Sequence, residues 1–475
     1  MRRFCVKAFL ALLLLAVLAG CAPKHRCVFD QKSPDAAFLA SKGDCATPDS
    51  YYYSCSCGAK GTETFPGETR HTPGDWIRWR TPSCTKEGTY VKFCTLCNEE
   101  LESKPIPTVE HAFSYGVCST CYRTNTEEKD GIMELGIPTA LYYTDKLIAN
   151  NGWDIVIRDG ILYRGAGDYS ANSGATTIWA YNIATGVWSP SGKADDEAVH
   201  RFVDLNGTLT ALGTDATGNW EFGNFYQLID GKWQKFRTIA GGVHVYDMAV
   251  FDGKIFAGIG TDVGGCPVSV STDGGQTFQS VPLYVDGQPL VMEEDQFARC
   301  YELLTLNGKL YAEVTLSGGT GGSSHALYRY KDGKLHYLRS ASAFFATAGA
   351  SYNYIHGEFD LNGVSYFGSC RGLFAVTDTD IQKIPLPGGE TVADCFLDGG
   401  TVYVLSYKYD SAAKMHNTVI YKTTTMTEGS FQEVKRFAYP VCPLAFAKDG
   451  NYLYLSMGYM AENEKNGTIL RIQIP

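Results

Sequence analysis

The feature that most constrains the fold of this chain is a turn signal that recurs along most of its length. Seven Asp-Gly or Asn-Gly pairs after residue 150 recur at similar intervals, each between two short runs of β-forming residues. The pairs are Asp159-Gly160, Asn206-Gly207, Asp252-Gly253, Asn307-Gly308, Asn362-Gly363, Asp398-Gly399 and Asp449-Gly450. Successive pairs are 47, 46, 55, 55, 36 and 51 residues apart. That spacing is typical of a four-stranded blade rather than of a helical solenoid unit.

Each pair supplies the positive φ that a tight hairpin turn requires, and the flanking residues alternate as strands do. The segment Met248 to Gly258 is an example, with its turn at Asp252-Gly253. A blade cannot bury both of its faces alone, so blades must close into a ring. We therefore predict an all-β fold: a seven-bladed β-propeller with four-stranded blades over residues 131–475. The last strand, 468–474, has nothing after it, and we expect residues 141–150 to complete its blade.

The N-terminus has the pattern of an export signal. Three positive charges in residues 1–7 precede an apolar run, 8–18, that ends in Ala19-Gly20-Cys21. A spanning helix needs about 20 apolar residues, and this run is about half as long. The stretch 18–21 resembles a bacterial lipobox, which implies a cleaved signal peptide, 1–20, and a lipid on Cys21. We expect a lipoprotein on the extracellular face of the bacterial membrane; ordinary secretion is the alternative.

Cysteines mark a separate region, 21–123, with units at about 27–71, 72–111 and a partial unit at 112–123. The run Cys45-x9-Cys55-x-Cys57-x13-His71 is followed by Cys84-x9-Cys94-x2-Cys97-x13-His111. A close cysteine pair with two more distant ligands suits tetrahedral zinc. Each run is expected to form one site, and Cys118 and Cys121 would join His25 and Cys27 in a third. Disulfides, or a mixture, remain the alternative in an exported protein, although residues 22–123 contain nine cysteines, an odd number.

Two resemblances to known families follow from these residues. The cysteine-rich region resembles the zinc-ribbon-like repeats that precede other modules in surface proteins of gut bacteria, although Cys55-x-Cys57 departs from the Cys-x-x-Cys spacing. The run Ser271-Thr-Asp-Gly-Gly-Gln-Thr-Phe278 resembles the Asp-box of sialidase-like propellers, and the aromatic residues after glycine at Trp188, Trp233 and Phe431 resemble kelch blades. An Asp-box is a turn device between outer strands, so this likeness concerns the fold and not catalysis.

Candidate ligand-binding residues lie in the loops that enter the innermost strands and in the loops after the second strands. Acidic, aromatic and basic side chains gather there, and a concave mouth lined by them suits a sugar, a basic peptide or a cation. The candidates are Asp168, Tyr169, Asp196, His200, Trp220, His244, Glu294, Arg299, Tyr354 and His356. The alternative is that these residues are solvated loop charges and packing aromatics.

The sequence favours binding over catalysis. A net charge of −10 argues against nucleic acid as a partner. Neither the arginine triad of a sialidase, nor a Gly-x-Ser-x-Gly elbow, nor a His-Glu-x-x-His pair is present. We expect a non-catalytic lipoprotein that binds an extracellular carbohydrate or protein, anchored to the lipid membrane and stiffened by zinc. The alternatives are a sialidase-like or other glycan-acting enzyme, with a pair such as Asp196 and Glu294 facing across the funnel, and a purely structural propeller.

Overall fold

A computed structural model describes residues 25–168, 170–261, 265–293, 295–318, 324–340, 355–376, 381–459 and 462–474. The predicted signal peptide and Cys21 lie outside the described residues, as do Tyr169, Glu294, Tyr354 and the side chain of His356. The described chain is all-β, with only short 3₁₀ turns besides its strands. Among the described residues no helix has the length and apolar character to cross a membrane. The chain divides into two compact units, Met1–Glu110 and His111–Pro475.

The first unit contains two small antiparallel sheets, each of three strands. One consists of β1 (Leu39–Ser41), β2 (Ser50–Ser54) and β3 (Lys60–Pro66), and the other of β4 (Ile77–Arg80), β5 (Gly88–Phe93) and β6 (Glu100–Ile106). Few apolar side chains are buried in this unit. Tyr51 stacks on Phe65 with ring centroids 5.9 Å apart, and Val91 is the main buried residue of the second sheet. Cores this small usually need disulfides or a metal to be stable.

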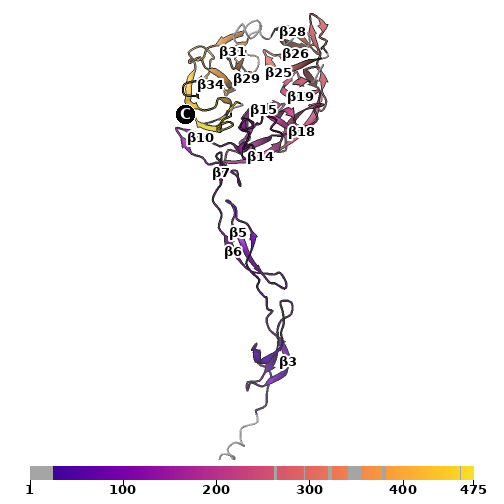
Figure 1. Ribbon diagram of the computed structural model, residues 1–475, viewed down its shortest axis with the longest axis vertical. Helices are drawn as coiled ribbons and strands as arrows, with labels where there is room; N and C mark the ends of the chain where they lie inside the picture. The colour runs from indigo at the N-terminus through magenta and orange to yellow at the C-terminus, as the bar shows by residue number, and fades with distance from the viewer. Residues whose placement is uncertain are drawn as a thin grey trace, which may run out of the picture. The chain divides into compact units, whose positions relative to one another are not determined.

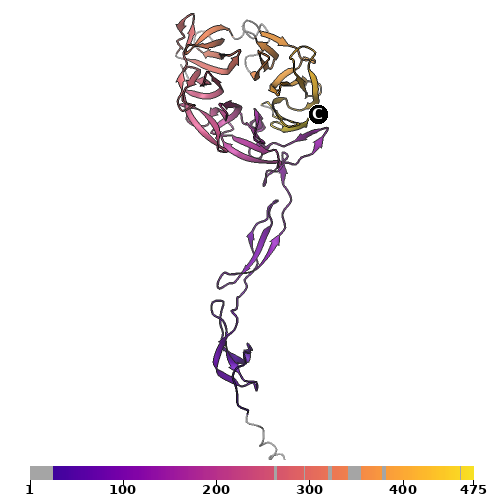
Figure 2. The ribbon, with the colours of Figure 1, turned by 180° about the vertical axis from the view of Figure 1, so that it is seen from behind.

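The second unit consists mainly of four-stranded antiparallel meanders. The first contains β11 (Ile155–Arg158), β12 (Ile161–Arg164), β13 (Thr177–Asn182) and β14 (Val187–Lys193), and the second contains β15 (Asp196–Leu205), β16 (Thr208–Ala216), β17 (Phe222–Ile229) and β18 (Lys232–Ala240). The third contains β29 (Ile355–Leu361), β30 (Val364–Ser369), β31 (Gly372–Val376) and β32 (Ile381–Ile384). The fourth contains β33 (Thr391–Asp398), β34 (Thr401–Asp410), β35 (Met415–Thr423) and β36 (Gln432–Tyr439). Figures 1 and 2 show these sheets following one another around a ring, as in a β-propeller.

A ten-stranded sheet lies between the second and third of these meanders in the chain. It joins β19 (Gly242–Phe251), β20 (Lys254–Thr261), β21 (Val268–Ser271), β22 (Gln279–Ser280), β23 (Leu283–Val285), β24 (Gln288–Pro289), β25 (Gln296–Leu306), β26 (Lys309–Gly318), β27 (Ser324–Lys331) and β28 (Lys334–Ser340). A single bridge between Gly260 on β20 and Arg299 on β25 connects the four strands β19 to β22 with the other six.

The ring is closed by a strand from the start of the second unit. The last sheet contains β37 (Pro443–Asp449), β38 (Tyr452–Met457), β39 (Ile469–Gln473), β10 (Ile132–Glu134) and β9 (Glu128–Lys129). An N-terminal segment does complete the sheet, but residues 141–150, where we expected it, lie within the 3₁₀ turns η2 (Pro138–Leu141) and η3 (Leu147–Asn150) and the loop between them. Pro138 explains part of the difference, because a proline pre-sets the φ of a turn and cannot donate to a ladder.

The predicted hairpin turns lie between the first and second strands of the sheets. In the first five pairs the Asp or Asn residue has a φ between 50° and 54°, and the following glycine is also positive. At the last two pairs the positive φ begins at Gly399 and at Gly450 instead. The Asp-box is a turn device as expected: Asp273 accepts hydrogen bonds from the Thr277 amide at 2.9 Å and from its hydroxyl at 2.6 Å. Phe278 packs against Phe225.

The cores lie between neighbouring sheets. Trp179 and Trp188 are fully buried in a cluster that also includes Leu135 and Tyr454. Val117, on β8 (Val117–Cys118), packs into the same cluster and pairs with β7 (Phe113–Ser114). The partial cysteine unit at 112–123 therefore packs against the ring.

Candidate functional site

A central cavity of about 480 Å³ is lined by the first strands of successive sheets. Its ionisable lining residues are Asp154, Arg201, Asp204, Asp247, Glu302, Glu358 and Asp394. Before the first four hairpin turns the cavity residue stands five positions ahead of the Asp or Asn, as Arg201 stands before Asn206. The offset is four before Asn362 and Asp398, where Glu358 and Asp394 line the cavity. The regular offset of the first four is a signal in the sequence that could have identified those lining residues.

Three of these carboxylates accept a hydrogen bond from a backbone amide on a neighbouring inner strand. Asp154 accepts the Phe202 amide at 2.7 Å, Asp247 accepts the Leu303 amide at 2.8 Å, and Asp394 accepts the Phe446 amide at 3.0 Å. The other oxygen of each carboxylate accepts the amide of the residue that follows it in the chain, at 2.7 to 2.9 Å. Because both oxygens of each carboxylate accept backbone hydrogen bonds, we assign these three groups a structural role in joining the inner strands.

Arg201 supplies positive charge to the cavity. It donates two hydrogen bonds to Glu302, at 2.8 and 3.2 Å, and lies 3.0 Å from Asp247. Burial opposes its charged form, but the two carboxylates raise the pKa of Arg201. Elsewhere in the cavity, burial raises the pKa of Asp394 to about 8. Arg201, Asp247 and Glu302 form a paired charge centre inside the cavity.

Two predicted ligand residues are buried and serve the scaffold. The Asp168 carboxylate accepts the amides of Ser170 and Ala171, and it also accepts a hydrogen bond from the Ser173 hydroxyl. Asp196 accepts hydrogen bonds from Tyr226 at 2.5 Å and from the Asn224 amide group, and neither aspartate is exposed. We assign both a structural role, so Asp196 does not offer the free carboxylate that a pair across the funnel requires.

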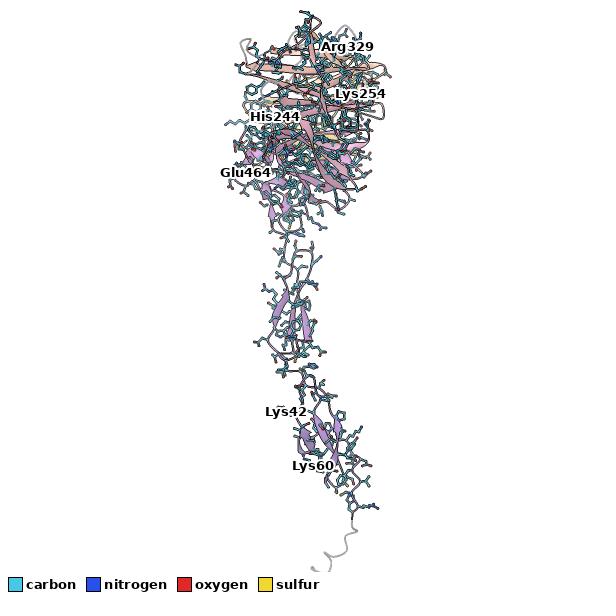
Figure 3. All side chains as sticks on the ribbon, turned by 90° about the vertical axis from the view of Figure 1, so that its right-hand side faces the viewer. Lys42, Lys60, His244, Lys254, Arg329 and Glu464 are labelled. Carbon is cyan, nitrogen blue, oxygen red and sulfur yellow. The ribbon has the colours of Figure 1, made fainter. Side chains whose placement is uncertain are left out.

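Three other predicted residues come together on one face of the ring. His244 stacks on Tyr246 with ring centroids 5.2 Å apart, and Tyr246 contacts Tyr301 at 4.7 Å. Arg299 donates to the Tyr301 hydroxyl at 3.0 Å, and His200 lies 6.2 Å from Tyr246 between ring centroids. We call His200, Asp215, His244, Tyr246, Arg299 and Tyr301 the aromatic cluster. Figure 3 shows the ring edge-on, with His244 and Lys254 toward opposite faces.

Histidines in the aromatic cluster are held by hydrogen bonds. His244 Nδ1 lies 3.0 Å from Asp215 Oδ1, and His200 Nδ1 lies 2.6 Å from the Thr214 hydroxyl. The His244 and Asp215 side chains are 17% and 28% exposed, so the pair is partly shielded but reachable from solvent. Trp220, another predicted residue, is 62% exposed on the loop that follows Asp215. Whether these side chains contact a ligand stays a prediction.

One local device positions both the cavity lining and the aromatic cluster. The first strands carry β-bulges at 199–201, 245–247 and 300–302. A bulge inserts one extra residue and changes where the neighbouring side chains point. In all three bulges the extra residue belongs to the aromatic cluster and the next residue lines the cavity. The pairs are His200 and Arg201, Tyr246 and Asp247, and Tyr301 and Glu302. Tyr301 was missed because bulges leave no spacing signal in a single sequence.

The cysteine-rich unit contains two groups of four candidate metal ligands. One group is His25, Cys27, Cys55 and Cys57, and the other is Cys45, His71, Cys94 and Cys97. Within each group all ligand atoms lie within 4.8 Å of one another. Thiolate and imidazole ligands in fours are what zinc binds in structural sites. The arrangement can therefore hold a metal ion.

The contacts that the candidate ligands make with surrounding residues also favour metal binding. His71 faces Cys97 Sγ with Nδ1 at 3.5 Å, and its Nε2 lies 3.4 Å from the Glu99 carboxylate. A metal-bound histidine commonly uses its other nitrogen in this way. Backbone amides, chiefly that of Cys57, lower the pKa of Cys55 to about 6. Burial opposes the same effect at Cys94, but the amides of Cys97 and Leu96 lower its pKa to about 6.

The grouping of ligands differs from the expected one. Cys45 and His71 do not join the cysteine pair of their own run but the next pair, Cys94 and Cys97. His25 and Cys27 join Cys55 and Cys57 rather than the pair at 118 and 121. The expected grouping was wrong because it assumed that each repeat closes on itself. A short repeat without a core is instead joined to its neighbour.

The remaining predicted ligands belong partly to the first unit and partly to the second. In the second unit, His111, Cys118 and Cys121 lie together, with Cys121 Sγ 3.4 Å from His111 Nδ1. Burial raises the pKa of Cys118, but the amides of Cys121 and Thr120 outweigh it and lower the pKa to about 6. Cys84 is half-buried in the bend before β5 of the first unit.

The fold and these groups define a β-propeller protein with a cysteine-rich unit that can bind metal. No protein-family model matches the chain, and no curated protein matches it. Among solved structures it is similar to the β-propeller domain of the Trilobed protease from Pyrococcus furiosus, with 8% identity, 68% of this chain and 95% of that chain covered, and a TM-score of 0.39.

Two further solved structures are similar at the same low level. An ulvan lyase, described as a new family of polysaccharide lyase, has 13% identity, 69% and 92% coverage and a TM-score of 0.39. BamB from Moraxella catarrhalis has 12% identity, 73% and 90% coverage and a TM-score of 0.32. These similarities concern the fold, and the site is argued from this chain's own residues.

Proposed function

We propose that this chain is an extracellular lipoprotein whose propeller binds a carbohydrate through the aromatic cluster. The observation that carries the proposal is the contiguous, partly exposed row His244, Tyr246, Tyr301 and Arg299. Flat aromatic faces suit the apolar faces of sugar rings, and a small number of placed polar groups give orientation. Nearby Trp220 presents a further exposed ring.

The charge of the aromatic cluster favours an acidic sugar. Asp215 is engaged by His244, while the Arg299 guanidinium is exposed at the end of the row and contacts a neutral phenol. Arginine is the side chain best suited to grip a carboxylate or sulfate with two parallel hydrogen bonds. An anionic polysaccharide therefore fits the cluster better than a neutral one.

The remaining parts of the proposal concern architecture. Counting the ten-stranded sheet as two blades gives seven blades, in agreement with the seven hairpin turns. We propose that the cysteine-rich unit binds zinc in its two ligand groups, and that a lipid on Cys21 anchors the chain to the outer face of the membrane. Metal analysis of the purified chain tests the zinc: two or more zinc ions per chain are expected. Less than one, with no free thiols, would favour disulfides.

A glycan array with residues 22–475 tests the binding proposal. We expect signals on acidic polysaccharides that decrease at least about tenfold in Arg299→Met, a change of about 1.4 kcal/mol. Tyr409→Phe is the control, because Tyr409 is 54% exposed and lies beside His416 without belonging to the aromatic cluster. Binding that is equal in the wild-type chain and Arg299→Met would contradict the proposal. A signal on proteins alone would replace carbohydrate with protein as the ligand.

A further inference from the structure

We infer that the aromatic cluster also cleaves its ligand, by β-elimination at a uronic acid residue of an acidic polysaccharide. The inference rests on the proposed carbohydrate binding and adds chemistry to it. Elimination at a uronate needs a base for the proton next to the carboxylate, a group that stabilises the resulting negative charge, and a proton donor for the leaving oxygen. The aromatic cluster contains one side chain suited to each task.

His244 is the group suited to act as base. Its Nδ1 lies 3.0 Å from Asp215 Oδ1 and also accepts a hydrogen bond from the Asp215 backbone amide at 3.3 Å, and these two contacts fix the ring. Asp215 stands at the end of β16 with a φ of 57°, the left-handed conformation that Asp159 and Asp252 also adopt in their turns. Asp215 is thus a positioning residue for His244.

Tyr246 and Arg299 supply the other two roles. The Tyr246 ring lies against His244 on one side and Tyr301 on the other, so its phenol stands next to the proposed base. A phenol so placed can give its proton to the leaving oxygen. Arg299 is fixed by its bond to the Tyr301 hydroxyl. From there a guanidinium can pair with the uronate carboxylate and stabilise the charge that develops on it.

The same residues are less suited to hydrolysis of a glycosidic bond than to β-elimination. Glycoside hydrolysis uses two free carboxyl groups on either side of the bond. In the described part of the second unit, backbone amides donate to both carboxylate oxygens of Asp154, Asp247 and Asp394. Glu302 is paired with Arg201. The aromatic cluster has one carboxylate, Asp215, which faces His244. Elimination requires neither a second carboxylate nor a water nucleophile.

The proposed step balances without a co-reactant. His244 takes the proton from C5 of the uronate, and the electron pair of that C–H bond forms the C4=C5 double bond. The C4–O4 bond breaks, and O4 leaves with the electron pair and receives the proton of Tyr246. The products are an unsaturated uronate on one chain and a new reducing end on the other. Transfer of the proton from His244 to Tyr246 through solvent restores the site.

Residues 22–475 incubated with polygalacturonate, alginate and chondroitin sulfate test the inference. We expect at least one of them to yield the ultraviolet absorbance of a conjugated uronate, with product masses that add up to the substrate and contain no added water. Tyr246→Phe and His244→Gln should each lower kcat at least about hundredfold. Asp215→Asn should lower kcat with little change in KM, as expected for a positioning residue. Tyr409→Phe, the control, should retain full activity.

The possible failures are distinguishable. Binding of these polysaccharides with no unsaturated product would overturn the elimination and leave the binding proposal standing. Products that carry added water would overturn elimination in favour of hydrolysis. Absence of binding to any of the three polymers and to the acidic polymers of the array would overturn both proposals. Unsaturated product from Tyr246→Phe and His244→Gln at the wild-type rate would show that a different site performs the reaction.

Discussion

His71 illustrates how much single residues decide in the cysteine-rich unit. One nitrogen of its ring faces Cys97, and the other lies 3.4 Å from the Glu99 carboxylate. Such outer contacts fix the orientation of the ring and raise the basicity of the ligand atom. At this scale function depends on a contact that no spacing in the sequence indicates, because Glu99 is one of three glutamates within residues 99–102.

Glu99→Gln removes the carboxylate beside His71. We expect it to lower the zinc affinity of the chain about tenfold, which is the smallest loss usual when a ligand's hydrogen-bond partner is removed, since the Glu99 side chain is 63% exposed. Competition with a chromophoric chelator measures the affinity. Glu100→Gln is the matched control, because it removes the same charge one position further along the chain. Equal losses in both variants would show that only the net charge matters.

Gly260 supports the aromatic cluster by having no side chain. A Cβ at this position would lie 2.6 Å from His244 Cδ2 and 2.9 Å from Tyr246 Cε2. We expect Gly260→Ala to reduce polysaccharide affinity at least about tenfold, because both rings must move. They are side chains and can yield, so the midpoint of thermal unfolding should fall by less than about 4 °C. Gly218→Ala, which meets nothing within 4 Å, should leave the affinity unchanged.

At the scale of elements, carboxylates join neighbouring inner strands through backbone amides. The carboxylate of Asp394 accepts the amides of Cys395 and Phe446, which belong to different sheets. This device recurs at Asp154 and Asp247. The sequence predicts the strands through their turns, but it does not reveal the bridges, which depend on how the sheets meet.

Removing the Asp394 carboxylate should destabilise the contact between the inner strands β33 and β37. Asp394→Ala leaves two amides without an acceptor, and we expect the free energy of unfolding to decrease by about 1 to 3 kcal/mol. Asp394→Asn keeps one acceptor oxygen and should cost less. Urea unfolding followed by tryptophan fluorescence measures both variants. A larger loss in the asparagine variant than in the alanine variant would contradict the proposed role of the acceptor atoms.

At the scale of the whole molecule, Arg201 connects three inner strands. It lies on β15 and pairs with Asp247 on β19 and Glu302 on β25, with both carboxylates nearly buried. A buried charge left without its partner is costly, so Arg201→Met should lower the free energy of unfolding by about 3 to 5 kcal/mol. Arg158→Met removes an exposed pair with Asp204 and should cost less than about 1 kcal/mol. Similar losses in urea unfolding would contradict this.

The half-buried Asp394 carboxyl also predicts a dependence on pH. Burial raises the pKa of Asp394 to about 8, against about 4 in an unfolded chain. The folded protein therefore holds more protons than the unfolded one between these values, and stability decreases as the pH rises from about 4 through about 8. Thermal unfolding should occur at a lower temperature at pH 9 than at pH 6. The decrease should be smaller in Asp394→Asn, and an equal decrease would exclude this carboxyl group as a cause.

The sequence by itself determined the local features of this protein. The positive φ of the Asp-Gly and Asn-Gly turns, the Asp-box and the set of cysteine and histidine ligands in the first unit all follow from residue types at short spacing. Such features depend on steric and hydrogen-bonding preferences that act within a few residues, and a single sequence contains those preferences in full.

Only the tertiary structure decided which distant residues meet. It paired Cys45 and His71 with the next cysteine pair, buried Asp168 and Asp196, and brought Tyr301 beside Tyr246 through a bulge. It also assigned ring closure to β10 rather than to residues 141–150. These outcomes depend on burial and on the shared hydrogen bonds of separate strands, and their energies involve partners far away in the chain, so no local pattern encodes them.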